Sequence, residues 1–405
     1  MKRQHWITTI ISVLALALII SGLFKYSFKT NTPKNQYSKL EYNAVNGPSS
    51  LRFPAEFEKQ QAIWMQWPSE VYNQGSHPVN PVIINIIKAF DPYIRVNVMA
   101  RDAAEIVQIK NLLKSSGYNG TNAHFYEINH YSIWTRDVGP IFVKNNLNKL
   151  NVVDFGFNNY SRDGDTVYIN TENAVDRLVA QKFNLPVINT RLISEGGAIE
   201  SNGKGTLMVT ESVALKRNPS MTKQQIENEY KRVLGVKKIV WLKKGLAEDD
   251  RITSGHINEI ARFSSPNTIL LAQVLPNDRY VDSYSNESYL RLEENYNILR
   301  NSTDQDGKPF RIIRIPMPPT VYQRPNEEGK IPIRSYLNYA VTNGAVLMQT
   351  YWKPGLSSAL RDTENGVKDI FKGVFPNRNI IGINAENVNL WGGGIHCITQ
   401  HMPAE

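Results

Sequence analysis

The single cysteine of the chain, Cys397, lies near the C-terminus in a run of three glycines followed by Ile-His-Cys. Four other segments also place polar residues in apolar surroundings, the first three of them beside glycines: residues 133–140, 195–197, 255–258 and 336–338. Together the segments contain a nucleophile, Cys397, a base, His256, and two carboxylates, Asp137 and Glu195. A thiolate activated by a neighbouring base is the usual arrangement for covalent catalysis, and glycines let the backbone approach a ligand closely. The sequence therefore indicates an enzyme with a cysteine nucleophile.

Each segment taken singly also has a structural explanation. Gly-Pro and Gly-Gly pairs occur in turns, His256 could be a hydrogen-bonded core histidine, and Asp137 could pair with Arg136. A lone thiol is often simply a small buried apolar group. Only the combination of the segments favours catalysis.

Metal and cofactor motifs are missing from the sequence. It has no C-x-x-C or H-E-x-x-H motif, no second histidine at ligand spacing from His256, no P-loop and no G-x-G-x-x-G fingerprint. We therefore expect no metal and no cofactor. One cysteine also excludes an internal disulfide.

Short apolar runs alternate with amphipathic patterns from residue 51 onward, which predicts an α/β domain. The expected strands are 62–67, 95–99, 124–128, 141–144, 205–210, 238–242, 268–271, 311–315, 345–349 and 379–383. The expected helices are 81–90, 103–115, 172–183, 222–234, 285–301 and 365–371, with a capping box at Thr222 and Gln225. On pattern alone, a doubly wound sheet remains an alternative.

The chain resembles the agmatine deiminase and Porphyromonas-type (bacterial) peptidylarginine deiminase family of the guanidine-modifying (pentein) superfamily. The resemblance lies chiefly in Trp-Thr-Arg-Asp-Val-Gly-Pro (134–140) and Gly-Gly-Gly-Ile-His-Cys-Ile-Thr-Gln (392–400). Further matching segments are 54–58, 63–68, 202–206, 217–219 and 255–263, so the likeness covers the chain from residue 51 to the C-terminus. The resemblance implies a five-bladed α/β propeller built from ββαβ modules, with the site in the central cavity.

The resemblance also implies how a planar, cationic guanidinium would be hydrolysed. Asp137 would grip the guanidinium nitrogens while Trp134 packs on its flat face. Cys397 would attack the central carbon as a thiolate. His256 would protonate the departing amine and then activate water against the thiouronium intermediate. An unperturbed cysteine is only about 3% thiolate at pH 7, so protonated His256 or the bound cation must activate it.

Three further positions match the family's substrate pocket. Glu195 corresponds to the carboxylate that orients the histidine, Asn338 to a polar residue lining the pocket, and Gly394 to the glycine segment before the cysteine. We expect Asn338 and Gly394 to contact the substrate.

Two positions depart from the family pattern. After the glycine, the pattern is His-x-Asp, whereas this chain has His256-Ile257-Asn258. If this segment is a strand, Asn258 faces the pocket beside His256 and Glu259 points away from it. Losing the charge leaves two interpretations: an enzyme that is slower or has a shifted substrate, or a guanidino-ligand binding protein that has lost catalysis. The second departure, Glu200 in place of a histidine, could suit the distal amine of agmatine or could face solvent.

The expected reaction is the deimination of agmatine to N-carbamoylputrescine or of peptidyl-arginine to citrulline, with release of ammonia. Arg162, in the segment 157–162, could hold a substrate carboxylate, although a single loop arginine is more often a solvated charge. A Cys–His protease or an amidinotransferase is a further alternative.

The N-terminus predicts a membrane or export function. Residues 7–24 carry no charged side chain, so residues 1–24 are expected to be a signal anchor or signal peptide, residues 25–50 a polar tether, and residues 51–405 the catalytic domain. We therefore expect membrane anchoring through residues 7–24, with the catalytic domain outside the cytoplasm or secreted. The net charge of +9 has no basic stripe interleaved with aromatic residues, so no nucleic-acid partner is expected. The sequence leaves the oligomeric state open.

Overall fold

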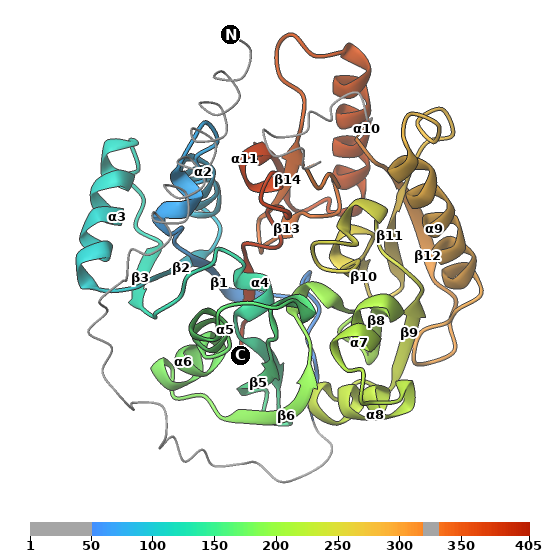
Figure 1. Cartoon of the computed structure of the whole chain (residues 1–405), viewed down its shortest axis with the longest axis horizontal. Helices are drawn as coiled ribbons and strands as arrows, with labels where there is room; N and C mark the ends of the chain where they lie inside the picture. The colour runs from blue at the N-terminus through green and yellow to red at the C-terminus, as the bar shows by residue number, and fades with distance from the viewer. Residues whose placement is uncertain (1–50, 319–331) are drawn as a thin grey trace, which may run out of the picture. The chain divides into compact units, whose positions relative to one another are not determined.

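The computed structural model of the protein describes residues 51–318 and 332–405 (Figure 1). The expected anchor at residues 7–24 and the tether lie outside these residues. Among the described residues, every helix is too short or too polar to cross a bilayer.

Five separate sheets make up the described part of the chain. The first has the order β16 (Gln400–Pro403), β1 (Gln60–Gln66), β2 (Arg95–Ala100) and β3 (Ala123–Glu127). The second contains β4 (Ile141–Lys144), β5 (Leu150–Gly156) and β6 (Val187–Ile193), and the third β7 (Ile199–Ser201), β8 (Thr206–Thr210) and β9 (Lys238–Leu242). The fourth contains β10 (Ala261–Ser265), β11 (Thr268–Gln273) and β12 (Arg311–Pro316), and the fifth β13 (Ala340–Val341), β14 (Ala345–Thr350) and β15 (Asn379–Asn384).

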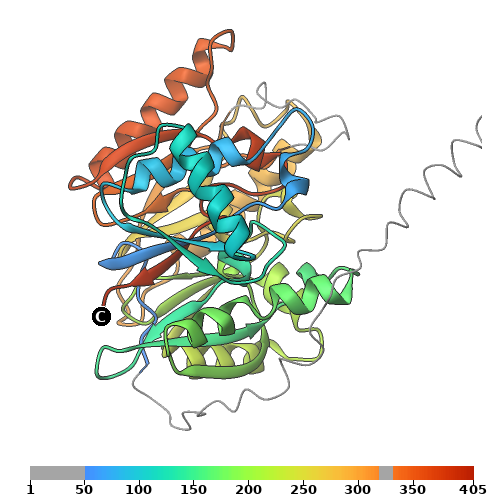
Figure 2. The same ribbon diagram turned by 90° about the vertical axis from the view of Figure 1, so that its left-hand side faces the viewer.

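The sheets share one plan. In each of the last four, the first two strands pair antiparallel and the third joins in parallel after a helical crossover. In the first sheet the antiparallel partner of β1 is the C-terminal strand β16, which Figure 2 shows beside β1. This arrangement confirms the α/β class with mixed sheets and replaces the single doubly wound sheet that the pattern left open.

The helices lie outside the sheets in the view of Figure 1. The crossovers of the first sheet contain α2 (Asn80–Phe90) and α3 (Ala103–Ser115), and that of the second α5 (Thr166–Glu172) and α6 (Val175–Lys182). The crossover of the third contains α7 (Glu211–Arg217) and α8 (Lys223–Leu234), that of the fourth α9 (Ser283–Arg300) and that of the fifth α10 (Ser358–Val374). The short helix α4 (Thr135–Val138) contains Asp137, and the short helix α11 (Glu386–Asn389) precedes Cys397.

All ten predicted strands are present, with small shifts at their ends. The capping box of α8 is confirmed, because Thr222 and Gln225 each bond the other's backbone N–H. The single helix expected at 172–183 is wrong: α5 ends at Glu172 and α6 begins at Val175. At the break, Oδ1 of Asn173 accepts a hydrogen bond from the backbone of Phe157, so this side chain bonds backbone outside the helix.

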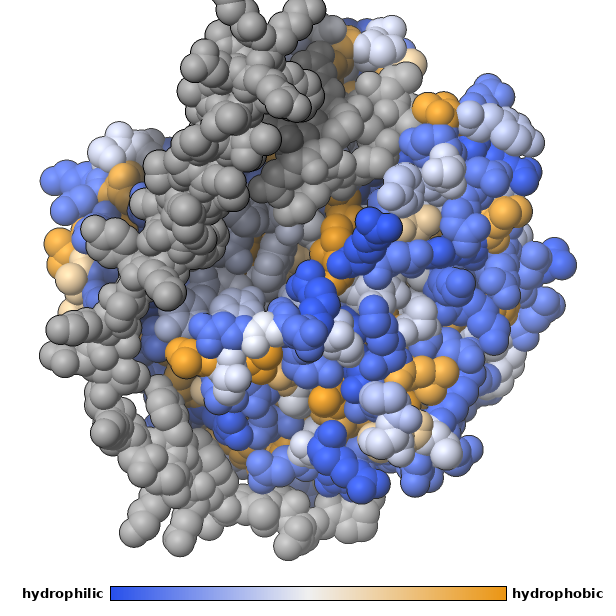
Figure 3. Space-filling model, in the orientation of Figure 1, coloured by the Kyte–Doolittle hydropathy of each residue, from blue (hydrophilic) through white to orange (hydrophobic). Residues whose placement is uncertain are grey.

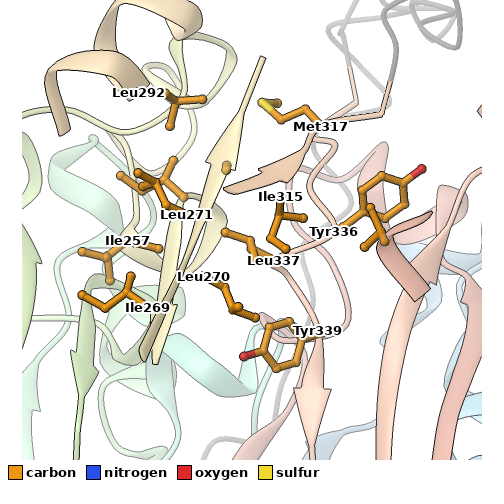
Figure 4. Packing of buried hydrophobic residues seen from close by; sticks show 14 of the residues in the cluster. Ile257, Ile269, Leu270, Leu271, Leu292, Ile315, Met317, Tyr336, Leu337 and Tyr339 are labelled. Carbon is orange, nitrogen blue, oxygen red and sulfur yellow. The ribbon is translucent and has the colours of Figure 1, made fainter. Parts of the chain in front are cut away.

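A large buried cluster joins residues of the third, fourth and fifth sheets and fixes two site segments, as Figure 4 shows for part of it. Ile257 and Leu337 are both fully buried in it. Because they are the neighbours of Asn258 and Asn338 in the sequence, their packing fixes where the two amides point. Where the described residues are visible in Figure 3, the face is largely hydrophilic, as expected for a strongly charged chain.

Candidate active site

Cys397 lies in the turns between α11 and β16, and its side chain is buried. Nδ2 of Asn338 donates a hydrogen bond to Sγ of Cys397 at 3.0 Å, and Nδ2 of Asn258 lies 3.6 Å from the same sulfur. Oε1 of Glu259 is 3.8 Å from it. Two amides and one carboxyl group therefore surround the nucleophile.

Asn338 lies just before β13, in the segment that follows β12, and the glycine segment before Cys397 allows the fit; Asn258 and Glu259 come from η5 (Ile257–Glu259). Oδ1 of Asn338 accepts from the backbone N–H of His396 at 2.7 Å. A Cβ atom on Gly394 would lie 2.6 Å from Oδ1 of Asn338, closer than any side chain tolerates. Gly394 therefore acts by letting Asn338 approach the backbone before Cys397.

His256 is held between two carboxylates. Its Nε2 lies 3.3 Å from Oε2 of Glu195, and its Nδ1 lies 3.8 Å from Oδ1 of Asp137. Glu195 is itself paired with Arg217, whose Nε donates to Oε1 at 2.6 Å. Nδ1 of His256 makes no hydrogen bond with any of the residues that the structure describes. This nitrogen is therefore free to exchange a proton with a substrate.

Asp137 is placed by the short helix α4 and held from two sides. The hydroxyl of Tyr160 donates to Oδ2 at 2.9 Å, and the backbone N–H of Gly197 donates to Oδ1 at 3.2 Å. A Cβ atom at Gly197 would lie 2.5 Å from Nδ1 of His256 and 2.8 Å from Oδ1 of Asp137. Only glycine fits where these two side chains meet.

Burial and charge shift the pKa values of the site. Burial alone would lower the pKa of His256, but Asp137 and Glu195 outweigh it and raise the pKa. The Arg217 guanidinium and His256 overcome the burial of Glu195 and lower its pKa. Burial, together with the nearby Glu259 and Asp137 carboxyls, raises the pKa of the Cys397 thiol well above its usual range. The free site therefore favours the protonated form of His256 and the neutral thiol of Cys397.

Asp137 and Cys397 open into a cavity of about 450 Å³, a size suited to a small ligand. Its lining includes the buried Asp137 and Cys397 and the indole of Trp134. A Cβ atom at Gly393 would lie 2.6 Å from the Trp134 ring and 3.1 Å from Sγ of Cys397, so the ring and the sulfur flank the same glycine. The exposed end of the lining contains Arg162, Arg251, Tyr284 and Trp391.

A second buried group lies behind the nucleophile. Glu56, His396 and His401 bring a carboxylate and two imidazoles within reach of one another. Arg136 and Arg262 both bond Glu56, and together with the histidines they hold its pKa well below the usual range despite burial. With two arginines already neutralising the carboxylate, a metal cation would be repelled here. The backbone N–H of Arg136 also donates to the carbonyl of Cys397 at 3.0 Å, so this cluster supports the loop of the nucleophile.

Two sequence-based assignments need correction. Glu259 was expected to point away from the site, but His256 precedes the 3-10 helix η5, not a strand. With about three residues per turn, residues 258 and 259 do not lie on opposite faces, and both approach the sulfur. Glu200 was expected to bind substrate, but it is buried outside the cavity lining, where it accepts from Nε of Arg262 at 2.9 Å. Burial raises the pKa of Glu200 to about 7.

The sequence analysis did not single out Tyr160. Asn159, Tyr160 and Ser161 all have positive φ angles near 50–60°, which is rare for residues other than glycine. This backbone turns the Tyr160 ring toward His256, with the ring centroids 6.0 Å apart, and its hydroxyl toward Asp137. Strain of this kind often marks functional sites, but three successive left-handed residues leave no sequence pattern that would have predicted it.

The motifs quoted above converge on one site, and the family model for Porphyromonas-type peptidyl-arginine deiminase matches residues 52–403. The chain belongs to this family. It is therefore a member of the deiminase class of hydrolases, as the sequence predicted.

Comparisons with individual proteins support the same family assignment. The chain is 30% identical over 385 residues to a Streptococcus mutans protein named "Putative agmatine deiminase", covering 89% of this chain and 98% of the relative. The agmatine deiminase of Enterococcus faecalis is similar in structure, with a TM-score of 0.76, 26% identity, and coverage of 89% of this chain and 99% of that one. A Porphyromonas gingivalis structure named "Putative Arginine Deiminase" has a TM-score of 0.72 and 25% identity, with coverage of 87% and 98%.

Proposed function

We propose that this deiminase hydrolyses the guanidino group of an arginine-like substrate to a ureido group and ammonia, through a covalent intermediate on Cys397. One observation carries the proposal. Cys397 and Asp137 line one cavity that is large enough for a single arginine-sized ligand, and Nδ1 of His256, which has no hydrogen-bond partner among the described residues, lies 3.8 Å from Oδ1 of Asp137.

The first half-reaction begins with the bound cation. Asp137 accepts hydrogen bonds from the guanidinium, and Trp134 covers its face. The positive charge lowers the thiol pKa, so that Cys397 loses its proton and Sγ bonds to the central carbon. The C–N bond to one terminal nitrogen then breaks, and protonated His256 supplies the proton with which ammonia departs.

The second half-reaction hydrolyses the thiouronium. Neutral His256 takes a proton from water as the water oxygen attacks the same carbon. The C–S bond breaks, the ureido product leaves and the thiolate is restored. Glu195 keeps the imidazole oriented in both steps through its contact with Nε2, and its pairing with Arg217 fixes the carboxylate.

The mouth of the cavity favours a substrate with a carboxylate. Arg162 and Arg251 are exposed lining residues, and the guanidinium of Arg162 lies 5.0 Å from the Tyr160 ring centroid. Glu248, the other carboxylate of the described lining besides Asp137, is buried and lies 3.8 Å from Arg334. Two cations at the mouth would attract the carboxylate of free arginine or of a C-terminal arginine, whose product is citrulline. They would repel the distal ammonium of agmatine, whose product is N-carbamoylputrescine.

The alternative is a protein that binds a guanidino ligand without turning it over. Asn258 motivates this alternative, because it replaces the charged residue of the family pattern directly beside the sulfur. The two functions separate in one experiment. The full-length protein is incubated with arginine, a peptide ending in arginine, and agmatine, and ammonia and ureido product are measured together with equilibrium binding.

Equal amounts of ammonia and ureido product, formed faster from the two carboxylate substrates, support the proposal. Binding without product from any of the three contradicts it and supports the binding protein. If agmatine is turned over fastest, the proposed reaction still holds, but the proposal that the cavity mouth selects a substrate with a carboxylate is wrong.

We also propose that the five sheets close into the family's propeller and that residues 7–24 anchor the domain outside the cytoplasm. The pairing of β16 with β1 supports closure, because it joins the two ends of the described chain in one sheet. The uncharged stretch at residues 7–24 supports the anchor. Membrane fractionation with protease treatment of intact cells tests the location. A domain that stays in the soluble cytoplasmic fraction would reject it.

A further inference from the structure

Glu259 is a buried carboxyl group at the nucleophile that the reaction described above does not use. Glu259 is only 3% exposed, and its Oε1 lies 3.8 Å from Sγ of Cys397. Nδ2 of Asn338 donates to the same oxygen. The second oxygen, Oε2, has no hydrogen-bond partner in the part of the chain that the structure describes. A buried carboxyl with an unpartnered oxygen is costly unless a ligand uses it.

Asn258 is occupied as a hydrogen-bond donor. Its Nδ2 lies 2.9 Å from Nδ1 of His396, whose Nε2 lies 2.9 Å from both oxygens of Glu56. Since Nε2 faces a carboxylate, Nε2 carries the proton and Nδ1 is an acceptor. Burial and the arginines Arg136 and Arg262 lower the pKa of His396 well below its usual range, which keeps the ring neutral. A carboxylate at position 258 would face the lone pair of Nδ1, whereas the amide of Asn258 fits.

The charges already present in the site do not neutralise the positive charge of the substrate. Asp137 lies beside the protonated His256, and Glu195 is paired with Arg217. These four charges cancel. Until Cys397 loses its proton, a guanidinium entering this buried site therefore needs a further anion close to the sulfur, because an unpaired buried cation is strongly disfavoured.

We propose that Glu259 ionises when the substrate binds and supplies the second carboxylate that holds the guanidinium, in place of the aspartate expected at position 258. The inference rests on the proposed function, since it concerns the same substrate and the same nucleophile, whose sulfur lies 3.8 Å from Glu259. In the binding step the carboxyl proton of Glu259 passes to solvent, and the resulting carboxylate pairs with the guanidinium. Asn258 keeps its separate task at His396 and at the sulfur.

The protonation state of Glu259 before substrate binds agrees with the proposal that binding ionises it. Burial and the nearby Asp249 together raise the pKa of Glu259 to about 8, so the group is largely neutral near pH 7 before the substrate arrives. The groups that face it are Asp249, His256, Cys397 and the amide of Asn338. A cation lowers the pKa of Glu259, so binding releases a proton. Affinity for the guanidinium therefore rises as the pH approaches 8 from below.

The test measures binding by calorimetry in two buffers of different ionisation enthalpy, which gives both affinity and protons released. The parent is the full-length Cys397→Ala protein, so that no turnover occurs and the thiol contributes no proton. The ligand is arginine, with agmatine as a second probe. Glu259→Gln in this background is expected to bind about 10- to 100-fold more weakly and to release about one proton fewer at pH 7.

Glu364→Gln is the matched control. Glu364 is also a partly buried carboxyl whose pKa is raised by burial, but it lies in α10 and accepts from the backbone of Tyr351 and Trp352. Glu364→Gln should leave both the affinity and the number of protons released unchanged. If Glu259→Gln fails to fold by circular dichroism, Glu259→Asp, which withdraws the carboxylate by one methylene, is measured with the same expectation of weaker binding.

Two results would overturn the inference. One is an affinity within twofold of the parent with the same proton release. The other is no binding of either probe by the parent while the wild type turns a substrate over. Failure of the proposed function is a different result: the wild type would then release no ammonia from any substrate, whatever Glu259 contributes to binding.

Discussion

One amide holds both the side chain and the backbone of the nucleophile. Nδ2 of Asn338 donates to Sγ of Cys397 at 3.0 Å, and Oδ1 of the same residue lies 3.4 Å from the backbone N–H of Cys397, which donates to it. The position of the sulfur and the stability of its thiolate therefore depend on one side chain that comes from a different sheet module.

Asn338→Asp separates these two contacts, because it keeps the acceptor for the backbone and removes the donor to the sulfur. We expect the pKa of Cys397 to rise further and kcat/KM to fall about 10- to 100-fold, the effect of one lost charge-assisted hydrogen bond and an added like charge. The rate of Cys397 alkylation as a function of pH measures the thiol pKa directly. An unchanged alkylation profile would mean that Asn338 does not stabilise the thiolate.

Gly197→Ala tests the meeting point of His256 and Asp137. The added Cβ would lie 2.5 Å from Nδ1 of the histidine, so one of the two side chains must move. We expect kcat/KM to fall by about 100-fold or more, since a displacement of about 1 Å at a reacting group has this effect. Gly373→Ala in α10, where the Cβ meets nothing within 4 Å, is the control and should leave activity unchanged. Full activity in Gly197→Ala would show that the two side chains need not stay in place.

The pH dependence should report the carboxylates around His256. Their charges raise its pKa above the usual value of about 6.5, and the protonated form is needed to release ammonia. The alkaline limb of kcat/KM therefore reports the loss of the His256 proton as the pH rises through this pKa, while ionisation of Cys397 and Glu259 sets the acid limb. Glu195→Gln removes one charge, so the alkaline limb of kcat/KM should move to lower pH by about one unit.

The same variant also leaves Arg217 without its buried partner, at a cost in stability of about 3–5 kcal/mol. The profile is therefore measured at a temperature where the variant remains folded by circular dichroism. An alkaline limb at the wild-type position would show that Glu195 does not set the pKa of His256.

The two arginines at the mouth should set substrate preference. Replacing both, in Arg162→Gln with Arg251→Gln, is expected to lower kcat/KM for arginine about 10-fold and to leave agmatine unchanged or improved, because only arginine carries the carboxylate. Arg300→Gln, in the last turn of α9, removes a charge away from the cavity and serves as the control. An equal fall in kcat/KM for arginine and for agmatine would show that these two arginines do not determine substrate preference.

Sequence reasoning predicted much of this molecule because the patterns were local. Ten of the sixteen described strands were visible as apolar runs, whereas β5, β6, β7, β10, β13 and β16 were not predicted; the capping box of α8 was visible as Thr222 and Gln225. Cys397, His256, Asp137 and Glu195 were recognised from residue types beside glycines, and they do lie together. What the patterns missed depends on backbone conformation.

Glu259 was the clearest error, because the side toward which it points follows from a 3-10 turn that the sequence does not distinguish from a strand. The position of Tyr160 depends on three left-handed residues in succession, and the burial of Glu200 depends on the distant Arg262. Such features are decided by tertiary contacts, not by local propensity.

The role of Cys397 is the central claim, and the rate of ureido product formation by the wild type and by Cys397→Ala tests it most directly. The assay uses full-length protein and the best of the three substrates, with Ser357→Ala, an N-cap residue of α10, as a folded control. We predict a loss of at least about 1,000-fold in Cys397→Ala, because no other residue can form the covalent intermediate. A variant that retains more than a tenth of the wild-type rate would contradict the mechanism.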